Sequence, residues 1–507
     1  MEIDEIVSPV ADPTETFQES AERPVALFRG KSILLNFGSL SAATAATRLT
    51  NLVANAVLAR RVSTSGYGIT GIAQSATNYF GLISDLGLGV VAIREGAQHP
   101  ERLQQVISSM LGLRLVLASA TVLLGLLVSP YLPFSETSRS LFRLYILTLP
   151  IQAISVDWVF RAIQRMQWNT VLQVAGAALT CSLTVLLVRE PRHLLRIGVI
   201  AVVAAAAPAV LGIVILRRQG FHARPTFSIA DAKYFLAQSM PLCATFLAML
   251  FYSQANTLIL GVVRGDSDVG LYGSAIRMSQ MFYQPIWIYF AALTPALMQS
   301  WAQSPERAHS LLSDSIRLTA ITTIGSGIVA ASAGTWLLAR VFGKSFGGAG
   351  QAFEIMIWTG VVSAIGQNWS ELCVAAKRNS ILILSNFLGA IVNVTVCLAT
   401  VSRMGIRGAA LSNLLAAMSV TGFLICAFGR EMGFKNLKGA ARPALAGVGA
   451  YLVSLATRWS APPVSATLSC LSFVALLLLT GAVTKEDLRR VRVLIMPARQ
   501  IASEFQP

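Results

Sequence analysis

The polar side chains that could do chemistry in this chain lie inside long apolar stretches. Arg48, Asn51 and Asn55 are spaced at 0, +3 and +7, which on a helix keeps them within an arc of roughly 60°. A charge near the bilayer centre costs at least about 2.5 kcal/mol, so such side chains normally face other helices or water. A guanidinium grips phosphate through paired hydrogen bonds, so this stripe suits an anionic group. The same spacing recurs in the second half with Arg277, Gln280 and Gln284.

Carboxylates and further amides lie in other apolar stretches. One predicted helix carries Gln74, Asn78 and Asp85 within about 40° of each other, and another presents Gln367, Asn368 and Glu371. Asp85 and Glu371 are candidates for neutralising the arginines or for binding a coupling cation. Asp85 also lies close to a predicted helix end, in Ser84-Asp85-Leu86-Gly87, where a structural role is equally compatible with the sequence.

These stripes have a second interpretation, because membrane bundles also use polar residues as interhelical hydrogen-bonding groups worth about 0.6 kcal/mol each. Arg277 would in addition be able to extend from near its helix end to the membrane interface. Arginine is costly for a purely structural role, so we favour a hydrated central cavity. The candidate substrate contacts are Arg48, Asn51, Asn55, Asn78, Asn256, Arg277, Gln280 and Gln284.

The sequence contains only incomplete matches to enzyme motifs. Gly343-Lys344-Ser345 is similar to the end of a phosphate-binding P-loop, but Leu338 stands where the first glycine is required. The same stretch matches G-x-S-x-G without a strand-turn-helix context. The cysteines form no C-x-x-C pair, and no H-E-x-x-H motif occurs. We therefore predict no catalytic residue, no metal site and no cofactor.

Composition places the whole chain in a membrane. Hydrophobic residues make up 54% of the 507 residues and charged residues only 13%, with a mean hydropathy of +0.63, whereas soluble chains carry about a quarter charged residues. The net charge of +16 is spread between apolar runs, unlike the dense basic patches of nucleic-acid-binding domains. A nucleic acid is therefore not an expected partner.

A spanning helix needs about 20 mainly apolar residues, and the sequence offers about fourteen such segments. The predicted spans are 32–60, 68–93, 109–131, 141–164, 168–188, 196–216, 233–262, 272–300, 316–342, 350–375, 380–401, 407–429, 442–459 and 464–483. We expect an all-α polytopic fold without an attached soluble domain, because several connections are shorter than about ten residues.

The distribution of basic residues predicts the orientation of these spans. With both termini in the cytoplasm, most of the 40 Lys and Arg residues fall in cytoplasmic segments. The segment 1–31 is acidic and lacks the basic start and early apolar run of a secretory signal, so we interpret it as a disordered cytoplasmic tail. The segment 484–507 is interpreted as a basic cytoplasmic tail.

A weak internal repeat divides the chain. At an offset of 205 residues, Asn51 falls on Asn256 and Tyr67-Gly68 falls on Tyr272-Gly273. Six predicted helices separate the copies, which predicts parallel repeats related by an axis along the membrane normal. We therefore expect an N-terminal lobe at 32–216, a C-terminal lobe at 217–429 and an extra helix pair at 430–483.

Several short motifs occur in the same order as in a known family. They are Gly66-Tyr67-Gly68, Asp85-Leu86-Gly87-Leu88 followed by Arg94, Val269-Gly270-Leu271-Tyr272-Gly273 followed by Arg277, Phe342-Gly343-Lys344, and Gly405-Ile406-Arg407-Gly408. In these motifs the chain resembles bacterial polysaccharide-biosynthesis flippases of the multidrug/oligosaccharidyl-lipid/polysaccharide superfamily. The resemblance covers about residues 32 to 430. These relatives often have twelve helices, so the extra pair leaves open a relationship to the fourteen-helix lipid-intermediate flippases.

The resemblance implies a flippase in the bacterial inner membrane that works by alternating access. Its substrate would be an oligosaccharide on polyprenyl pyrophosphate, moved for exopolysaccharide, O-antigen or capsule synthesis, with membrane lipid and polysaccharide polymerase and export proteins as partners. Arg48 and Arg277 would contact the pyrophosphate or acidic sugars. Two alternatives remain open: a multidrug exporter of the same superfamily and a membrane glycan polymerase or ligase.

Overall fold

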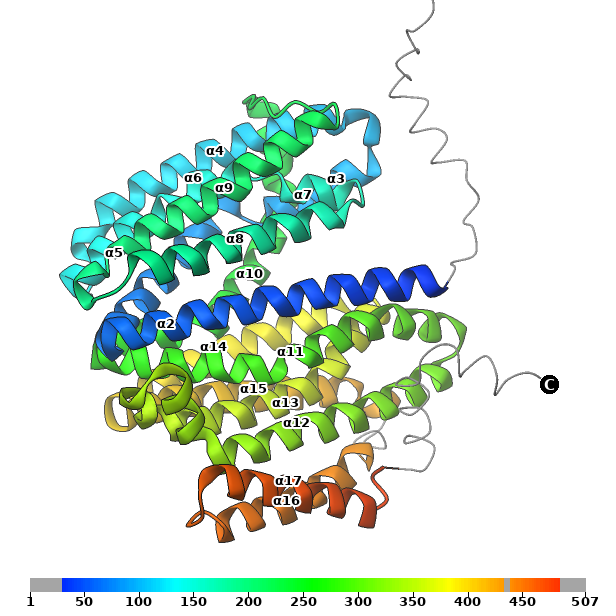
Figure 1. Cartoon of the computed structure of the whole chain (residues 1–507). Coiled ribbons are helices and arrows are strands. Elements are labelled where there is room, and N and C mark those ends of the chain that lie inside the picture. The colour runs from blue at the N-terminus through cyan, green and yellow to red at the C-terminus, as the bar shows by residue number, and fades with distance from the viewer. Residues whose placement is uncertain (1–29, 433–437, 484–507) are drawn as a thin grey trace, which may run out of the picture.

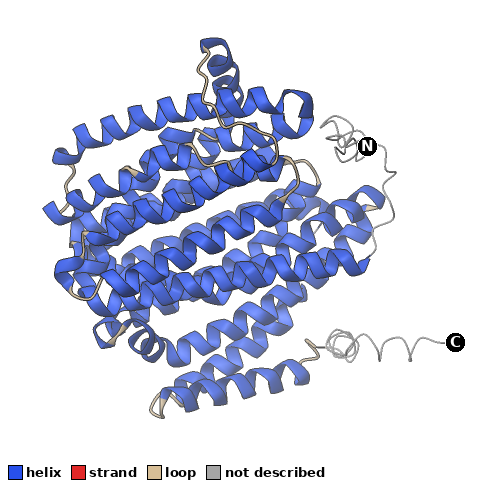
Figure 2. Ribbon diagram, turned by 45° about the horizontal axis from the view of Figure 1, so that its top comes forward, coloured by secondary structure: helices blue, strands red, loops and turns tan. Residues whose placement is uncertain are grey.

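The structure, a computed structural model, describes residues 30–432 and 438–483. These residues form helices joined by short turns, with no strand in either described range (Figure 2). Eight of the described helices are long and apolar enough to cross a membrane, or nine if one bent pair is a single span. The all-α polytopic fold is confirmed, while the count of fourteen spans stays a prediction.

The α-helices in chain order are α2 (Gly30–Asp85), α3 (Leu88–Gln98), α4 (Leu103–Val128), α5 (Glu136–Ile146), α6 (Thr148–Ala153), α7 (Asp157–Ala162), α8 (Met166–Leu187), α9 (Arg196–Arg218), α10 (Ile229–Arg264), α11 (Asp266–Gln303), α12 (Pro305–Phe342), α13 (Gly350–Ala375), α14 (Asn379–Met404), α15 (Ile406–Met432), α16 (Lys438–Ala456) and α17 (Pro462–Leu479).

The first two predicted spans are joined more closely than the sequence suggested. α2 runs through the expected connection at 61–67, and only Ser63 leaves helical geometry, with φ 66° and ψ 174°. The Ser63 hydroxyl accepts a hydrogen bond from the Gly66 amide (3.4 Å), as an N-cap does. The helix then breaks after Asp85, where Leu86 and Gly87 have positive φ, and α3 continues at a bend of 42°.

The expected span at 141–164 is divided into α5, α6 and α7. Pro150 lies within α6 and has no amide to donate to the preceding turn. In the same segment, the hydroxyl of Thr148 donates to the carbonyl of Tyr145 (2.7 Å).

The connection expected at 263–271 is also mostly helical. α10 ends at Arg264, Gly265 turns the chain with φ 87°, and α11 begins at Asp266. The carboxylates of Asp266 and Asp268 lie in the first turn of α11, where they complement the positive end of the helix dipole.

The helices lie in two groups on either side of α2 (Figure 1). Figure 1 shows α3 to α9 gathered on one side of α2 and α11 to α15 on the other, and α2 packs against α4, α5 and α8 as well as against α11. The division into lobes at 32–216 and 217–429 remains a prediction that this arrangement favours.

The predicted extra helix pair forms a hairpin. α16 and α17 pack against each other and against α12 (Figure 1). The Tyr451 hydroxyl of α16 donates to Glu354 of α13 (2.9 Å), and its ring meets Trp358 edge-on. The predicted tails at 1–31 and 484–507 lie outside the described residues, apart from the two residues that open α2.

Candidate functional site

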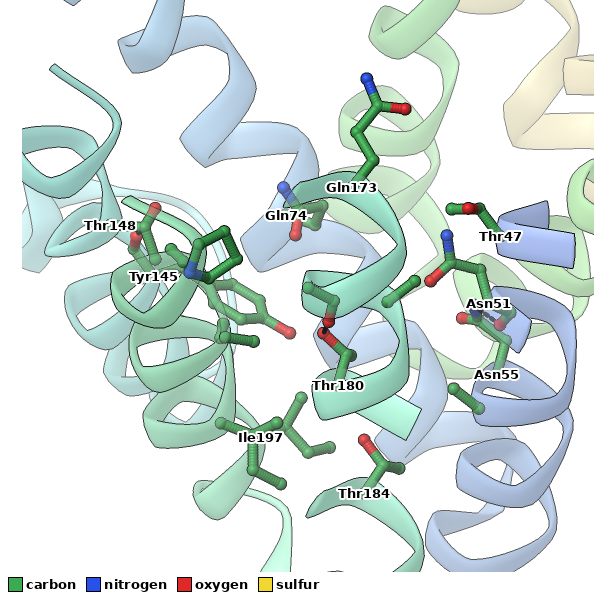
Figure 3. Close-up of a pocket in the computed structure, with 18 of the residues that line it drawn as sticks. Thr47, Asn51, Asn55, Gln74, Tyr145, Thr148, Gln173, Thr180, Thr184 and Ile197 are labelled. Atoms are coloured by element: carbon green, nitrogen blue, oxygen red, sulfur yellow. Dashed lines mark hydrogen bonds between the residues drawn. The ribbon is translucent and has the colours of Figure 1, made fainter. Parts of the chain in front are cut away.

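The polar stripe predicted on the first helix lines the largest of the three cavities described, called the large cavity. This cavity has a volume of about 730 Å³ and is bounded by α2, α5, α6, α8 and α9, with Arg277 entering from α11 (Figure 3). Arg48, Asn51 and Asn55 line it together. They share one face because their spacing follows the helical repeat. Gln74 lines it from beyond the kink in α2.

Arg277 reaches this cavity from the opposite group of helices. Its guanidinium carbon lies 4.7 Å from the centroid of the Tyr67 ring, a cation–π geometry. Tyr67 is buried, and its hydroxyl donates to Asn55 (3.3 Å). Arg277 therefore connects α11 to the polar face of α2.

The charge of the cavity is positive. The charged residues among its lining are Arg48, Arg277 and Asp157, and Asp157 is paired with Arg161 (3.4 Å). The lining thus carries two guanidinium groups and one carboxylate, and that carboxylate already has a cationic partner. This electrostatic balance favours an anionic ligand over a cationic one.

Much of the remaining lining was not predicted. Hydroxyl and amide side chains from the broken α5–α6 segment and from α8 complete the wall, namely Tyr145, Thr148, Gln152, Asn169, Gln173, Thr180 and Thr184 (Figure 3). Isolated Thr and Gln residues in apolar runs resemble ordinary helix-packing residues, so only the three-dimensional arrangement identifies them as a lining.

Asp85 lies in a smaller cavity of about 360 Å³ that shares Gln152 and Asp157 with the large one. Its carboxylate forms an ion pair with Arg114 of α4 (3.0 Å). Asp85 therefore neutralises an arginine that the sequence analysis had not singled out. Its role in binding a coupling cation stays a prediction.

Glu371 of α13 is held by two hydrogen bonds. Thr294 donates to it from α11 (2.6 Å) and Gln367 donates from the preceding turn (2.7 Å). Asn368, beside it, is fully buried and bonds to Thr319 of α12 (3.1 Å). These contacts join neighbouring helices.

Asn256 lies away from the large cavity. It is only 2% exposed, and its amide nitrogen has four possible acceptors: Tyr272, Asn393, the Ala409 carbonyl and Ser412, at 3.0 to 3.2 Å. Because an amide carries two N–H groups, at most two of these bonds are strong at once. The structure favours interhelical hydrogen bonding for Asn256 rather than substrate contact.

The other predicted contacts are dispersed. Asn78 accepts a hydrogen bond from Gln74 (3.1 Å) but is not among the lining residues of the large cavity. Gln280 lines a third cavity, between α10, α11, α13 and α15. Gln284 lines none of the three cavities described. The stripe predicted on α11 thus does not act as one surface.

The two groups of helices meet at one end through glycines of α2 and α11. A Cβ atom at Gly68 would lie 1.6 Å from the carbonyl oxygen of Asp266, and one at Gly270 would lie 1.9 Å from that of Thr64. The hydroxyls of Thr64 and Ser267 form a hydrogen bond across the same contact (3.2 Å). Main chain meets main chain here, so no larger residue fits at either glycine.

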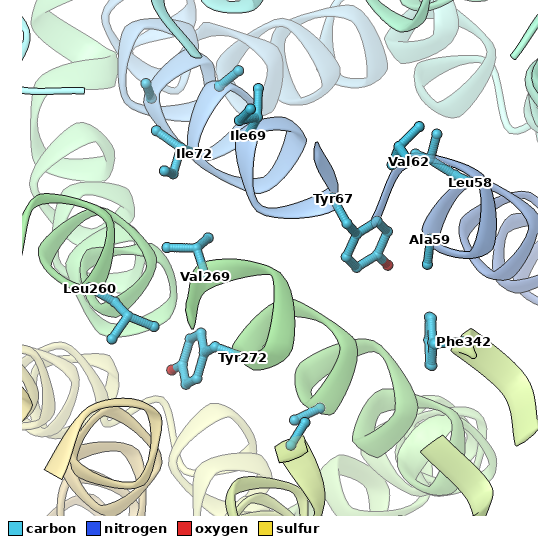
Figure 4. Close-up of a cluster of buried hydrophobic side chains, with 14 of the residues drawn as sticks. Leu58, Ala59, Val62, Tyr67, Ile69, Ile72, Leu260, Val269, Tyr272 and Phe342 are labelled. Carbon is cyan, nitrogen blue, oxygen red and sulfur yellow. The ribbon is translucent and has the colours of Figure 1, made fainter. Parts of the chain in front are cut away.

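Aromatic side chains seal this junction. Tyr67 packs on Phe342 and Phe346 with ring centroids 6.0 and 5.7 Å apart, and Figure 4 shows the Tyr67 ring beside Ala59 and Phe342. Arg60 donates to the carbonyl oxygen of Val341 (2.9 Å). The end of the molecule where α2, α11 and α12 converge is therefore closed.

Solved structures share this fold. A lipid II flippase, MurJ, in an inward closed conformation is 15% identical, with a TM-score of 0.72 over 89% of this chain and 99% of that chain. An inward-facing multidrug resistance MATE family transporter of the MOP superfamily is 14% identical, with a TM-score of 0.63 over 78% and 96%. The MATE multidrug transporter DinF-BH gives 0.56 at 15% identity over 82% and 98%.

Sequence comparison identifies the family. A protein of Escherichia coli (strain K12) assigned as an O-antigen transporter is 20% identical over 221 residues, which are 43% of this chain. The match spans only about half, 53%, of that relative. The model of a family described as polysaccharide biosynthesis protein matches residues 33–301, more than half of the chain. The chain, a multi-pass membrane protein, therefore belongs to the polysaccharide biosynthesis protein family.

Proposed function

We propose that this protein is a flippase that moves polyprenyl-pyrophosphate-linked oligosaccharides across the bacterial inner membrane for surface polysaccharide synthesis. The observation that carries the proposal is the cationic cavity lined by Arg48 and Arg277 in a member of this family. A pyrophosphate offers several anionic oxygens to a pair of guanidinium groups. No covalent step is needed, so the protein acts as a transporter rather than as an enzyme.

Alternating access supplies the movement. In the predicted topology, with cytoplasmic termini, the junction of α2 and α11 lies at the periplasmic end. Its closure by Gly68, Gly270 and Tyr67 corresponds to a state shut toward the periplasm. Opening this junction while the opposite end closes would release the head group outward, and the lipid tail would remain in the bilayer.

The test is transport by protein reconstituted in vesicles. The probe is the lipid-linked oligosaccharide that accumulates in cells lacking the protein, and its appearance in the opposite leaflet is followed with a membrane-impermeant reagent. Arg48→Ala and Arg277→Ala should each transport at about a tenth of the unsubstituted rate or less, since a charge-assisted hydrogen bond contributes about 1.5 to 3 kcal/mol. Arg224→Ala, which removes a charge between α9 and α10, is the matched control. Unimpaired transport by both cavity variants would refute the assignment.

A multidrug exporter is the alternative that the MATE fold supports. Such a protein would use an acidic residue for ion coupling, yet Asp85 is paired with Arg114 and Glu371 is hydrogen-bonded to Thr294. Cells lacking the protein separate the two functions. Lost surface polysaccharide with stranded lipid-linked repeat units supports the flippase, whereas intact polysaccharide with new drug sensitivity supports the exporter.

A further inference from the structure

We propose that the third cavity, between α10, α11, α13 and α15, binds the sugar ring that is bonded to the pyrophosphate. This inference rests on the proposed flippase function and assigns the two parts of the head group to different cavities. The phosphates lie with Arg48 and Arg277, and the first sugar lies in the third cavity.

The chemical character of the third cavity matches a sugar. Its volume is about 250 Å³, its walls include the aromatic rings of Tyr252, Tyr283 and Trp287, and no Asp, Glu, Lys or Arg is among its described lining residues. A sugar ring presents apolar C–H faces and a rim of hydroxyl groups. Aromatic rings cover the former, and amides, which both donate and accept, bind the latter.

Two of the three amides are held by hydrogen bonds from their N–H groups. Gln367 donates its N–H to Glu371 (2.7 Å) and Asn413 donates to the hydroxyl of Tyr272 (2.8 Å). Each amide carbonyl is thereby left as an acceptor, and its direction is set by the bond behind it. Gln280 is exposed in the cavity.

The size of the cavity accommodates one sugar ring. A water molecule occupies about 30 Å³ in the liquid, so the cavity corresponds to on the order of eight waters, close to one sugar ring. A polyprenyl tail would not need three amides, and a cationic drug would find no carboxylate among the described lining residues.

α11 connects the two cavities. Arg277 faces the large cavity, while Ile276, Gln280, Tyr283 and Trp287 recur at 0, +4, +7 and +11 and line the third. Arg277 and Gln280 are separated by a rise of about 4.5 Å along the helix. A phosphate and the sugar bonded directly to it are neighbours on the same scale, and the proposal assigns one of them to each residue.

The decisive experiment compares binding of two probes to full-length protein in nanodiscs: undecaprenyl pyrophosphate and the lipid-linked oligosaccharide that accumulates in cells lacking the protein. Trp287→Leu and Gln280→Leu remove the aromatic surface and the amide while retaining bulk. Trp287→Phe keeps an aromatic ring. Trp336→Leu, at a 41% exposed tryptophan of α12, is the matched control.

We expect the unsubstituted protein, Trp287→Phe and Trp336→Leu to bind the glycosylated probe at least about fivefold more tightly than the sugar-free probe, the value of roughly one retained hydrogen bond. Trp287→Leu and Gln280→Leu should bind both probes nearly equally, with unchanged affinity for the sugar-free lipid. Variants that keep the full preference would overturn the sugar site. Equal losses for both probes would overturn it in favour of a lipid-tail site. Failure of the unsubstituted protein to bind either probe would instead refute the flippase function itself.

Discussion

Asn51 and Asn256 occupy corresponding positions in the predicted repeat, yet their surroundings are opposite. Asn51 is half-buried and opens on the cavity of about 730 Å³. Asn256 is 2% exposed and enclosed by Asn393 of α14 and Ser412 of α15. The same residue type at the same place in a helix is thus a cavity wall in one half and a packing contact in the other. Helix position alone does not determine which role a polar residue takes.

The two groups of helices approach each other closely, main chain against main chain, at the junction of Gly68 and Gly270. Gly68→Ala would place a Cβ 1.6 Å from the Asp266 carbonyl oxygen, so α2 and α11 must separate. Overpacking costs about 3 kcal/mol at the upper end of its usual range, which predicts a roughly hundredfold loss of the closed state. Cysteine labelling at this end should rise, and transport should fall. Gly422→Ala, where nothing lies within 4 Å, is the control; equal labelling in both variants would contradict the prediction.

The next largest effect tests the buried amide of the C-terminal half. Asn256→Ala removes a buried donor and leaves Tyr272, Asn393 and Ser412 without it. We expect a loss of stability of about 1.5 kcal/mol, near the maximum for hydrogen bonds between membrane helices. Thermal unfolding in detergent measures it. Transport per folded molecule should be unchanged, and a selective transport defect would instead return Asn256 to the substrate path.

Asn51→Ala is the matched change in the N-terminal half, where the asparagine lines the large cavity. The Asn51 side chain lines the cavity, so its loss should weaken substrate binding about threefold, the value of a hydrogen bond of about 0.7 kcal/mol. Stability should remain that of the unsubstituted protein. If Asn51→Ala lowered the unfolding temperature as much as Asn256→Ala, the contrast between the two halves would be lost.

The smallest expected effect refines the packing network. Ser412 is one of four acceptors near Asn256, so Ser412→Ala leaves three others available. We expect destabilisation below about 0.6 kcal/mol, the average for such bonds. When Asn256→Ala is already present, adding Ser412→Ala should cause almost no further destabilisation, because both changes remove the same bond. Additive effects in the unfolding temperature would show that Ser412 acts independently of Asn256.

The helical class and most helices were predictable from apolar runs alone, because lipid requires every spanning backbone group to bond within its own segment. The breaks were less predictable. The segments around Ser63 and Gly265 look like polar connections in sequence, but helical geometry continues to within one residue. Local capping by Ser63 and the close approach of two glycines shorten these turns, and neither effect is visible in hydropathy.

The candidate site was predictable where spacing decided it. Arg48, Asn51 and Asn55 share a face at any rotation of a regular helix, and the structure places them on one cavity. The stripe of Arg277, Gln280 and Gln284 was not predictable in the same way, because α11 has different neighbours on two sides. A long arginine side chain reaches the ring of Tyr67, while Gln280 faces the other cavity. Which helix lies opposite is tertiary information.

The placement of α11 between two cavities has a consequence for evolution. Arg277, which would hold the phosphate, and Gln280, which would hold the sugar, are neighbours on one helix but line different cavities. Substitutions among the lining residues of the third cavity therefore leave both arginines of the large cavity in place. Under the proposed function, a lineage that changes its surface glycan would alter the lining that α10, α11, α13 and α15 give to the third cavity, while the arginines of the other cavity are inherited intact.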